Sequence, residues 1–386
     1  MRHDRPFWTF VWIRVAFWLG TAAALLWVPR TGNARIPDRA WDPFTDLVFG
    51  TFDQWDSRWF LWIARHGYDH RSAAFFPLYP ALLSALGSSL VWGTLLSLVA
   101  AGLGAWCVSE IAREKLGVAG ARDTVLVLAL FPTAFVFTAL YSDGLFLLFS
   151  AASFLAARQR RPWLAGIAGG LAVATRSMGL ALLPALVYLL WPQTRREVWR
   201  LAPLLLLPAA LGAYALYLEH RLGDAFASTD AQAIGWDREL HPLGPLSGLW
   251  MAIQAGVHGT LDVVRDLPRT SLAETGDPHA LQVATWNAVH LVVLGAVFWL
   301  TWVAWRRLDT ALGLYALSTL VLILTFPSEG FPLISLPRFV VTDFPVLIAL
   351  ASVLQGRPGL RTGVLVALGA LSAIAGIAFS RGIWIA

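Results

Sequence analysis

Long apolar runs follow one another along almost the whole chain of 386 residues, and they limit its possible folds more than any other feature. A helix of about 20 apolar residues is long enough to cross a lipid bilayer. The runs lie at 7–28, 73–112, 124–140, 141–158, 163–192, 201–220, 281–305, 311–326, 339–356 and 363–386. We therefore expect an all-α polytopic membrane protein with about 10 to 11 transmembrane helices. These helices would form a single transmembrane domain, 1–386.

Composition excludes the other broad classes of protein. Hydrophobic residues make up 57% of the chain and charged residues 14%, whereas a soluble domain is about a quarter charged. The 20 Trp and 22 Phe argue against a disordered chain, because disordered chains are poor in aromatic residues. Cys107 is the single cysteine, which excludes an intrachain disulfide framework. The arginines behind the net charge of +5 are spread in small groups between apolar runs, which does not indicate a nucleic-acid partner.

Basic clusters beside the apolar runs predict how the chain is oriented. The clusters are Arg113/Lys115/Arg122, Arg158/Arg160/Arg161, Arg195/Arg196/Arg200, Arg306/Arg307 and Arg357/Arg361. The positive-inside rule places these clusters and the N-terminus in the cytoplasm. Two long polar stretches, about 29–72 and 221–280, then become external loops.

Two of the runs do not fit a simple count of helices. Residues 73–112 must cross an odd number of times, so we expect one full span after a partial helix that is broken by the prolines of 75–80. Residues 163–192 must cross twice, so we expect two short helices that meet near 175–177. Non-helical backbone at membrane depth is tolerated only inside protein or along a wet cavity. The second run is therefore a candidate wall of a site.

One segment of the first external loop has the spacing of an amphipathic helix. Four aromatic residues and one histidine follow one another at steps of three or four: Phe52, Trp55, Trp59, Trp62 and His66. This spacing places them on one helical face. A tryptophan-rich amphipathic helix outside the bilayer is expected to lie in the plane of the membrane interface.

Asp56 is the best-placed acidic residue of this segment. It falls at the edge of the aromatic stripe, whereas Asp53 lies further round toward water. A carboxylate at the interface can act as a general base between a lipid-phase substrate and a water-phase one. The alternative is a solvated interfacial helix whose acidic residues merely face water.

Charged residues at membrane depth are candidates for function, because burying a charge in a bilayer costs several kcal/mol. Asp143 and Arg176 are two such residues, and the alternative is that they form a structural ion pair. Arg338 lies at the outer mouth of a late span, where an arginine can hold a phosphate group bidentately. Arg14 is expected to snorkel to the membrane surface, and His290 is expected to be a core histidine.

Sequence motifs for nucleotides and metals are missing from the chain. There is no G-x-x-x-x-G-K-[ST] loop and no G-x-G-x-x-G ahead of a helix, so a nucleotide-driven mechanism has no support. There is no H-E-x-x-H motif and no Cys/His cluster, so a tightly bound zinc is not expected and no motif indicates a cofactor. Asp53 and Asp56 are near enough in sequence to share a divalent cation, although their spacing fits no known loop motif.

Several short motifs follow one another along the chain. They are Trp55-Asp56-Ser57, Ile63-Ala64-Arg65-His66-Gly67-Tyr68, Phe75-Phe76-Pro77-Leu78-Tyr79-Pro80, Phe131-Pro132-Thr133, Tyr141-Ser142-Asp143, Ala174-Thr175-Arg176-Ser177, Gly223-Asp224 with Gln232 and Trp236, and Leu336-Pro337-Arg338-Phe339. In this order on a polytopic chain, they resemble the bacterial branch of the PIG-V family. That family belongs to the GT-C glycosyltransferases and is named for the enzyme that adds the second mannose to GPI anchors.

The resemblance implies a fold and a reaction. The fold is that of the GT-C enzymes, with the interfacial amphipathic helix in the first external loop. The reaction is an inverting transfer of mannose from polyprenyl-phosphate-mannose to an extracytoplasmic acceptor, which is a glycan, a glycolipid or a protein. The protein is then integral to the plasma (inner) membrane, with its active site on the extracytoplasmic face.

The resemblance also implies roles for individual residues. Asp56 carries over as the general base. Residues assigned to the donor phosphate are Arg176, Arg338 and His66. Residues assigned to substrate binding are Asp53, Trp55, Trp59, Asp143, Gln232 and Trp236. The chain departs from the family in two places. The family more often has Glu at 143 and Ser at 144, where this chain has Asp143 and Gly144, and many eukaryotic members have His where this chain has Trp59.

Three alternative functions stay open at this point. The same fold can use polyprenyl-phosphate glucose or an arabinofuranose donor, which a donor panel would separate. A membrane transporter or flippase would move its substrate without covalent change, along charged residues that are open to both sides. A non-catalytic subunit of a larger mannosyltransferase complex would be inactive when it is purified alone.

Overall fold

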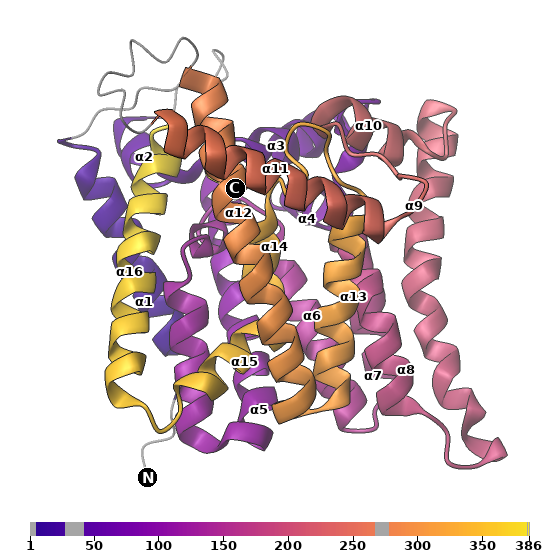
Figure 1. The fold of residues 1–386 in the computed structure, drawn as a ribbon. Coiled ribbons are helices and arrows are strands. Elements are labelled where there is room, and N and C mark those ends of the chain that lie inside the picture. Colours follow the sequence, from indigo (N-terminus) through magenta and orange to yellow (C-terminus); the bar gives the residue numbers. More distant parts are fainter. Residues whose placement is uncertain (1–4, 28–41, 267–277, 384, 386) are drawn as a thin grey trace.

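The structure, a computed structural model, describes residues 5–27, 42–266, 278–383 and 385, and this part of the chain folds into helices and their connections (Figure 1). An isolated antiparallel bridge, Arg238 with Ser328, also occurs there. The elements in chain order are α1 (Pro6–Ala24), α2 (Pro43–Val48), η1 (Gly50–Phe52), α3 (Asp56–His66), η2 (Ser72–Ala74), α4 (Leu78–Ala85), α5 (Leu90–Leu130), η3 (Ala134–Phe137), α6 (Asp143–Arg158), α7 (Pro162–Thr175), η4 (Ser177–Leu182), α8 (Leu183–Leu190), η5 (Arg195–Leu205), α9 (Leu206–Leu222), α10 (Ala227–Trp236), α11 (Pro245–Asp266), α12 (Pro278–Val303), η6 (Ala304–Leu308), α13 (Thr310–Thr325), α14 (Leu336–Thr342), α15 (Phe344–Leu354) and α16 (Pro358–Ser380).

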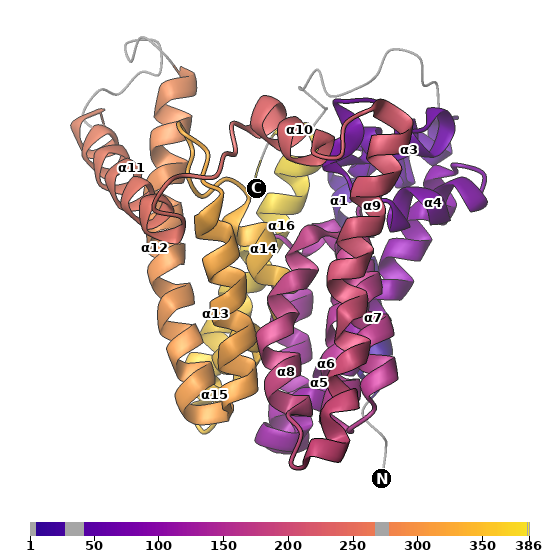
Figure 2. The same cartoon turned by 90° about the vertical axis from the view of Figure 1, so that its right-hand side faces the viewer.

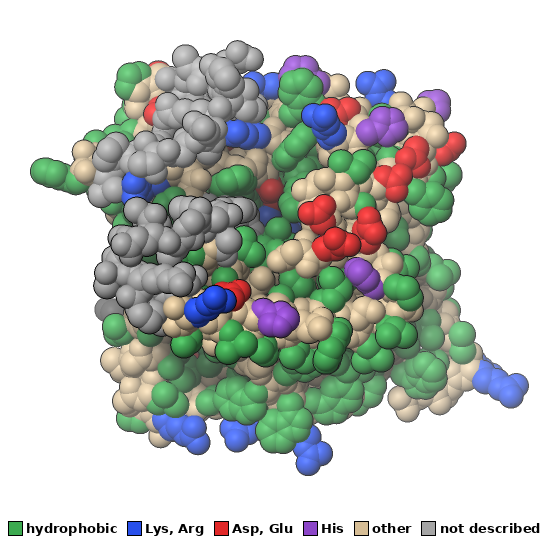
Figure 3. Space-filling model, turned by 45° about the horizontal axis from the view of Figure 1, so that its top comes forward, with side chains coloured by type: hydrophobic (Ala, Val, Ile, Leu, Met, Phe, Trp, Pro, Cys, Tyr) green, Lys and Arg blue, Asp and Glu red, His purple; other side chains and the backbone are tan. Residues whose placement is uncertain are grey.

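The long helices form a bundle, and five other helices gather at its upper end in Figure 1. These five helices, α2, α3, α4, α10 and α11, are called the cap below; Figure 2 shows α3, α4, α10 and α11 at the same end from the side. In Figure 3 acidic and histidine side chains lie on the capped end, above a belt of hydrophobic side chains. The polar stretch 221–280 contains α10 and α11, so its described part is largely helical.

The expected all-α membrane architecture is confirmed. Within the described residues, five helices are long and apolar enough to cross a membrane, and α14 with α15, bent by 77°, makes a sixth candidate span. The described helices that are long enough to cross a membrane are thus fewer than the roughly 10 to 11 spans expected from the apolar runs. The reason is that other apolar runs are divided into shorter helices, at 162–175, 177–190 and 310–325.

Helix α5 has 41 residues but does not run straight. A straight helix would place Leu130, its last residue, about 50 Å from Ser97. Tyr141 follows Leu130 closely in the sequence, yet its carbonyl accepts a hydrogen bond from the Ser97 hydroxyl at 2.9 Å. The chain turns at Gly117, whose φ of +67° glycine adopts without strain. Helix α5 therefore has an outgoing and a returning arm, and α4 ahead of it is the partial helix expected in 73–112.

The run 163–192 contains the break that its length predicts. Helix α7 ends at Thr175, Arg176 is extended with φ −158° and ψ 137°, and η4 and α8 continue the run. A Cβ on Gly179 would lie 2.6 Å from the backbone nitrogen of Val173, so η4 lies directly against α7. This close return places Arg176 at the tip of the pair of short helices.

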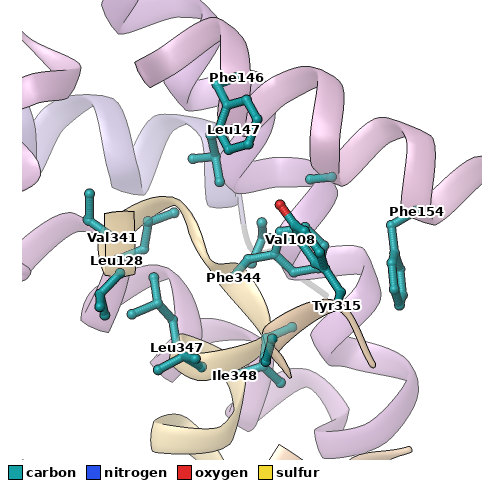
Figure 4. Close-up of a cluster of buried hydrophobic side chains, with 14 of the residues drawn as sticks. Val108, Leu128, Phe146, Leu147, Phe154, Tyr315, Val341, Phe344, Leu347 and Ile348 are labelled. Atoms are coloured by element: carbon teal, nitrogen blue, oxygen red, sulfur yellow. The ribbon is translucent and has the colours of Figure 1, made fainter. Parts of the chain in front are cut away.

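The main hydrophobic core joins α5, α6, α13, α14 and α15 (Figure 4). Phe344 packs against Phe154 and Tyr315, at ring-centroid distances of 5.5 and 5.2 Å. A second cluster lies under the cap and includes Phe60 and Tyr79. Burial of these large rings from distant segments sets the relative positions of the helices that carry the charged residues described below.

Glycine allows two helix pairs to approach closely. A Cβ on Gly144 of α6 would lie 2.3 Å from the carbonyl oxygen of Ser97 in α5, and one on Gly166 of α7 would lie 2.2 Å from that of Pro203. Small residues at such contacts let backbones touch in membrane bundles. At Gly144 the close approach of the α5 backbone leaves no room for a larger side chain.

Buried polar side chains in the bundle differ from expectation in one case. Arg14 is 1% exposed, and its Nη1 donates to the Ala129 carbonyl at 3.1 Å and to Ser372 Oγ at 3.2 Å. The expectation that it snorkels is wrong, because α5 and α16 enclose it and supply acceptors. His290 is buried, as expected of a core histidine, and its ring stacks on Phe331 at 5.0 Å.

An ion-pair network joins helices at the end away from the cap. Arg158, at the end of α6, pairs with Glu114 at 2.6 Å and also with Asp309. Lys115 Nζ lies 3.2 Å from the same Asp309 carboxylate. The basic residues predicted to face the cytoplasm are thus partly neutralised by acidic residues of neighbouring helices.

Candidate active site

Four charged side chains from four separate segments meet where the cap joins the bundle. Asp56 is the first residue of α3, and Asp143 is the first residue of α6. Arg176 is the extended residue between α7 and η4, and Arg338 lies in α14. Asp56 and Arg338 are 282 positions apart in the sequence, so tertiary packing brings this charged cluster together.

Arg338 is the centre of the charged cluster. Its Nη1 donates to Asp56 Oδ2 at 2.5 Å, and its Nη2 donates to Asp143 Oδ2 at 2.8 Å. Its Nε lies 3.2 Å from both oxygens of Asp143. All three guanidinium nitrogens of Arg338 therefore face carboxylates, and the arginine bridges two acidic residues.

Asp143 connects the two arginines of the cluster. Its Oδ1 accepts a hydrogen bond from Arg176 Nη1 in addition to those from Arg338. The side chain of Asp143 is fully enclosed, with 0% exposure, whereas that of Asp56 is 18% exposed. Breaking a buried pair by removing one partner is strongly destabilising. Asp143 thus has the position of a structural anchor, and Asp56 has the position that a substrate can reach.

Tyr141 holds the backbone on both sides of Trp55. Its hydroxyl donates to the Gln54 carbonyl at 3.2 Å and accepts from the Asp56 backbone nitrogen at 3.3 Å. The guanidinium of Arg338 lies over its ring, 4.5 Å from the centroid. Sequence reasoning assigned no role to Tyr141, although it stands in the motif that ends at Asp143.

The backbone is strained within three residues before two of the charged residues. Trp55, which precedes Asp56, has φ +52°, and Ser335, three residues before Arg338, has φ +66°. Such conformations cost a residue other than glycine about 1–3 kcal/mol, and surrounding structure must hold them in place. Both charged residues therefore follow a turn that only the folded protein maintains.

Helix α3 begins later than the aromatic spacing predicts. Phe52 is 2% exposed and belongs to η1, where its ring packs against Phe379 at 6.1 Å. The helix starts at Asp56, so the expected stripe is not continuous on one helical face. Trp55 and Trp62 are exposed, as residues at a membrane interface would be.

Three aromatic rings lie side by side between α3 and α10. Trp59 stacks on Phe75 with a centroid distance of 5.9 Å, and Trp236 meets the edge of the same ring at 5.7 Å. Gln232 is on α10, one turn before Trp236. Three residues predicted to bind substrate, Trp59, Gln232 and Trp236, thus lie on elements that adjoin the charged cluster.

Two other predicted residues lie outside the charged cluster. His66 is the last residue of α3, about 15 Å along the helix axis from Asp56, and its ring contacts that of Trp62 in a tilted arrangement, with a centroid distance of 4.1 Å. Asp53 is half-buried and interacts electrostatically with Arg58. Burial lowers the pKa of Arg58, and the charge of Asp53 opposes that shift.

Arg238 is a cationic neighbour that sequence reasoning missed. It follows α10, and its guanidinium lies 5.2 Å from the ring centroid of Phe339, beside Arg338. Burial lowers its pKa to about 10; the charges of Arg176 and Arg338 add to this effect, and that of Asp56 opposes it. The only sequence signal was its position two residues after Trp236, the last motif residue of that stretch.

The acidic residues of the site are the candidates for holding a metal ion, although no sequence motif predicts one. Among the described residues, no group of three His, Cys, Asp or Glu side chains is arranged to hold a metal ion. Asp56 and Asp143 face arginine N–H groups. The shared cation considered for Asp53 and Asp56 has no third protein ligand in that part of the chain.

One family of known proteins matches part of the chain. Residues 74–220 match the family model described as dolichyl-phosphate-mannose-protein mannosyltransferase, and the matched stretch contains Asp143 and Arg176. No curated protein and no solved structure gives a significant match. The matched segment is less than half of the 386 residues, and it is similar to a family of mannosyltransferases described as using dolichyl-phosphate-mannose.

Proposed function

We propose that the protein transfers mannose to a hydroxyl group of an extracytoplasmic acceptor, with inversion at the anomeric carbon and with Asp56 as general base. The observation that carries the proposal is the contrast between Asp56 and its surroundings. Its carboxylate is 18% exposed, while the carboxylate of Asp143 in the same cluster is fully enclosed. We assign the chain to the PIG-V-like bacterial branch, on the motifs around Asp56 and Arg338 that lie outside residues 74–220.

The proposed reaction moves one proton and one glycosyl group. The acceptor oxygen forms a bond to the anomeric carbon of mannose, and the bond from that carbon to the phosphate oxygen breaks. The hydroxyl proton passes to the Asp56 carboxylate, and polyprenyl phosphate leaves. Asp56 thereby loses a negative charge while the phosphate gains one, so catalysis requires positive charge near the phosphate.

The charged cluster suits both halves of this reaction. Arg338 occupies Oδ2 of Asp56, which leaves Oδ1 for the acceptor proton. Arg176 and Arg338 supply positive charge for the departing phosphate. We assign Trp59 and Trp236 to the sugar, because an aromatic face packs well against the apolar face of a sugar ring. The roles of His66, Asp53, Trp55 and Gln232 stay predictions.

The proposed orientation places the cap outside the cytoplasm. Lys115 lies two residues before the turn at Gly117 in α5, Arg158 ends α6 and Arg361 lies in the first turn of α16. This turn and these helix ends point away from the cap (Figure 1), and the positive-inside rule assigns such clusters to the cytoplasm. Helix α1 begins at that end, at Pro6 (Figure 1). The charged cluster would then face the extracytoplasmic side of the plasma membrane, where a polyprenyl-linked donor and the acceptor meet.

Asp56→Asn tests the assignment of the base. We expect transfer of labelled mannose to native membrane acceptors to fall roughly 10²–10⁴-fold, the range for losing a general base, while donor binding and folding stay unchanged. Asp230→Asn, at an exposed acidic residue of α10, is the matched control and is expected to be fully active. Full activity of Asp56→Asn would remove Asp56 as base.

The same assay tests the donor and identifies the acceptor. Polyprenyl-phosphate glucose and an arabinofuranose donor are expected to give no product. Mass spectrometry of the labelled product would distinguish a glycan, a glycolipid and a protein acceptor. Transfer of another sugar in preference to mannose would contradict the proposed substrate, while inactivity of the pure, folded chain would favour a non-catalytic subunit.

A further inference from the structure

We propose that Arg238 is a ligand of the donor phosphate and acts together with Arg176. This inference rests on the proposed function, and it adds a residue that neither the sequence motifs nor the matched family segment includes. Arg238 lies outside residues 74–220, in the connection between α10 and α11.

The surroundings of Arg238 hold its side chain toward the charged cluster. Its backbone forms the bridge with Ser328, and its backbone nitrogen donates to the Gln232 carbonyl at 3.3 Å. Its Nη2 donates to the Ile334 carbonyl at 2.6 Å, four residues before Arg338. The side chain therefore crosses from the cap to the segment that carries Arg338.

Arg176 and Arg238 both contact one ring. The guanidinium carbons of Arg176 and Arg238 lie 5.5 and 5.2 Å from the centroid of Phe339. Two cations held this close repel one another unless an anion neutralises them. Arg176 and Arg238 are both half-buried residues and not fully enclosed ones, so an anionic group can approach the pair.

The lack of a carboxylate partner among the described residues separates Arg238 from the other two arginines. Arg338 uses all three of its nitrogens on Asp56 and Asp143, and Arg176 is paired with Asp143. Within the described residues, Arg238 has no carboxylate partner, and its Nε and Nη1 make no hydrogen bond. Of the three arginines, Arg238 is the one without a carboxylate partner among the described residues, and it has two guanidinium nitrogens left for a ligand.

The charge balance of the site supports a phosphate ligand at Arg238. Three arginines face two carboxylates, which leaves one positive charge without a partner. A phosphodiester donor carries one negative charge and would neutralise it. During the reaction the phosphate gains a second negative charge as Asp56 takes up its proton. A cation that is not already bound to a carboxylate is the one best able to respond to that change.

Arg238→Ala tests the inference through phosphate binding rather than turnover alone. We would measure direct binding of a short-chain polyprenyl phosphate to the purified full chain, and donor KM and kcat in the transfer assay. A charged hydrogen bond contributes about 1.5–3 kcal/mol, so we expect binding to weaken and KM to rise roughly 10- to 100-fold. Arg265→Ala, at an exposed arginine of α11, is the control and should change neither.

Arg238→Lys is a second variant that tests the inference if Arg238→Ala does not fold. Lysine keeps the charge but loses the planar pair of donors, so we expect a smaller loss of phosphate binding than in Arg238→Ala. Unchanged binding and KM in a folded Arg238→Ala variant would overturn the inference. If Arg238→Ala does not fold, unchanged values in Arg238→Lys would overturn it.

Failure of this inference and failure of the proposed function are distinguishable. Phosphate binding needs no acceptor and no base, so Asp56→Asn should bind polyprenyl phosphate as the unmodified protein does. Loss of binding in Arg238→Ala with full transfer in Asp56→Asn would support the phosphate ligand and reject the base. Loss of transfer in Asp56→Asn with unchanged binding in Arg238→Ala would support Asp56 as the base and reject Arg238 as a phosphate ligand.

Discussion

Replacing Asp143 with asparagine tests whether the charged cluster, and not apolar packing alone, holds the site together. The side chain is fully enclosed and accepts hydrogen bonds from Arg176 and Arg338. Asparagine has nearly the same shape, so no cavity forms. It removes the negative charge, however, and presents an amide to guanidinium donors. Removing one partner of a buried ion pair costs about 3–5 kcal/mol, and we expect the free energy of unfolding to fall by about this amount.

The assay is denaturant unfolding of the purified protein in micelles, followed by tryptophan fluorescence. Asp123→Asn is the matched control, because Asp123 also pairs with an arginine, Arg361, at 2.7 Å, but that arginine is 33% exposed. An ion pair near the surface contributes about 1 kcal/mol or less. Adding Arg176→Gln to Asp143→Asn removes one unpaired cation and should recover part of the loss. Equal losses in Asp143→Asn and Asp123→Asn would refute the reasoning.

Three further substitutions test the contacts around the cluster. Gly144→Ala should lower the free energy of unfolding by about 1–3 kcal/mol, since its Cβ would meet Ser97 at 2.3 Å; a neutral result would mean that α5 and α6 can move apart. Tyr141→Phe keeps the ring under Arg338 but removes the hydroxyl and its two hydrogen bonds. At about 1 kcal/mol for each bond, we expect kcat to fall by roughly 30-fold; an unchanged kcat would place Tyr141 outside the machinery. Trp55→Gly should be more stable than Trp55→Ala by about 1 kcal/mol, because glycine adopts φ +52° without strain; equal unfolding midpoints would argue against strain.

Much of the fold could be predicted because its signals are local. The runs 141–158 and 311–326 correspond within a few residues to α6 and α13, since the hydrophobicity of a segment decides whether it enters a membrane. The break within 163–192 followed from length, because two crossings in one such run require short helices that turn back. The start of α3 could not be predicted, because the strained turn at Trp55 is held by neighbours distant in sequence.

The candidate site could be predicted only as separate residues. Asp56, Arg176 and Arg338 were each identified, and a pair of Arg176 with Asp143 was considered, but the link from Arg338 to both acidic residues could not be inferred. Arg14 shows the same limit, because the burial of a charge depends on the helices around it.

The amino-acid sequence by itself determined that this protein is helical, lies in a membrane and carries acidic and basic residues at its polar turns. Those properties belong to single segments and to their partition between lipid and water. Only the tertiary structure decided which charges meet, which of them stays open to a ligand and that Arg238 joins them. Electrostatic energy depends on distances of a few ångströms between residues far apart in the chain, and those distances exist only after the helices have packed.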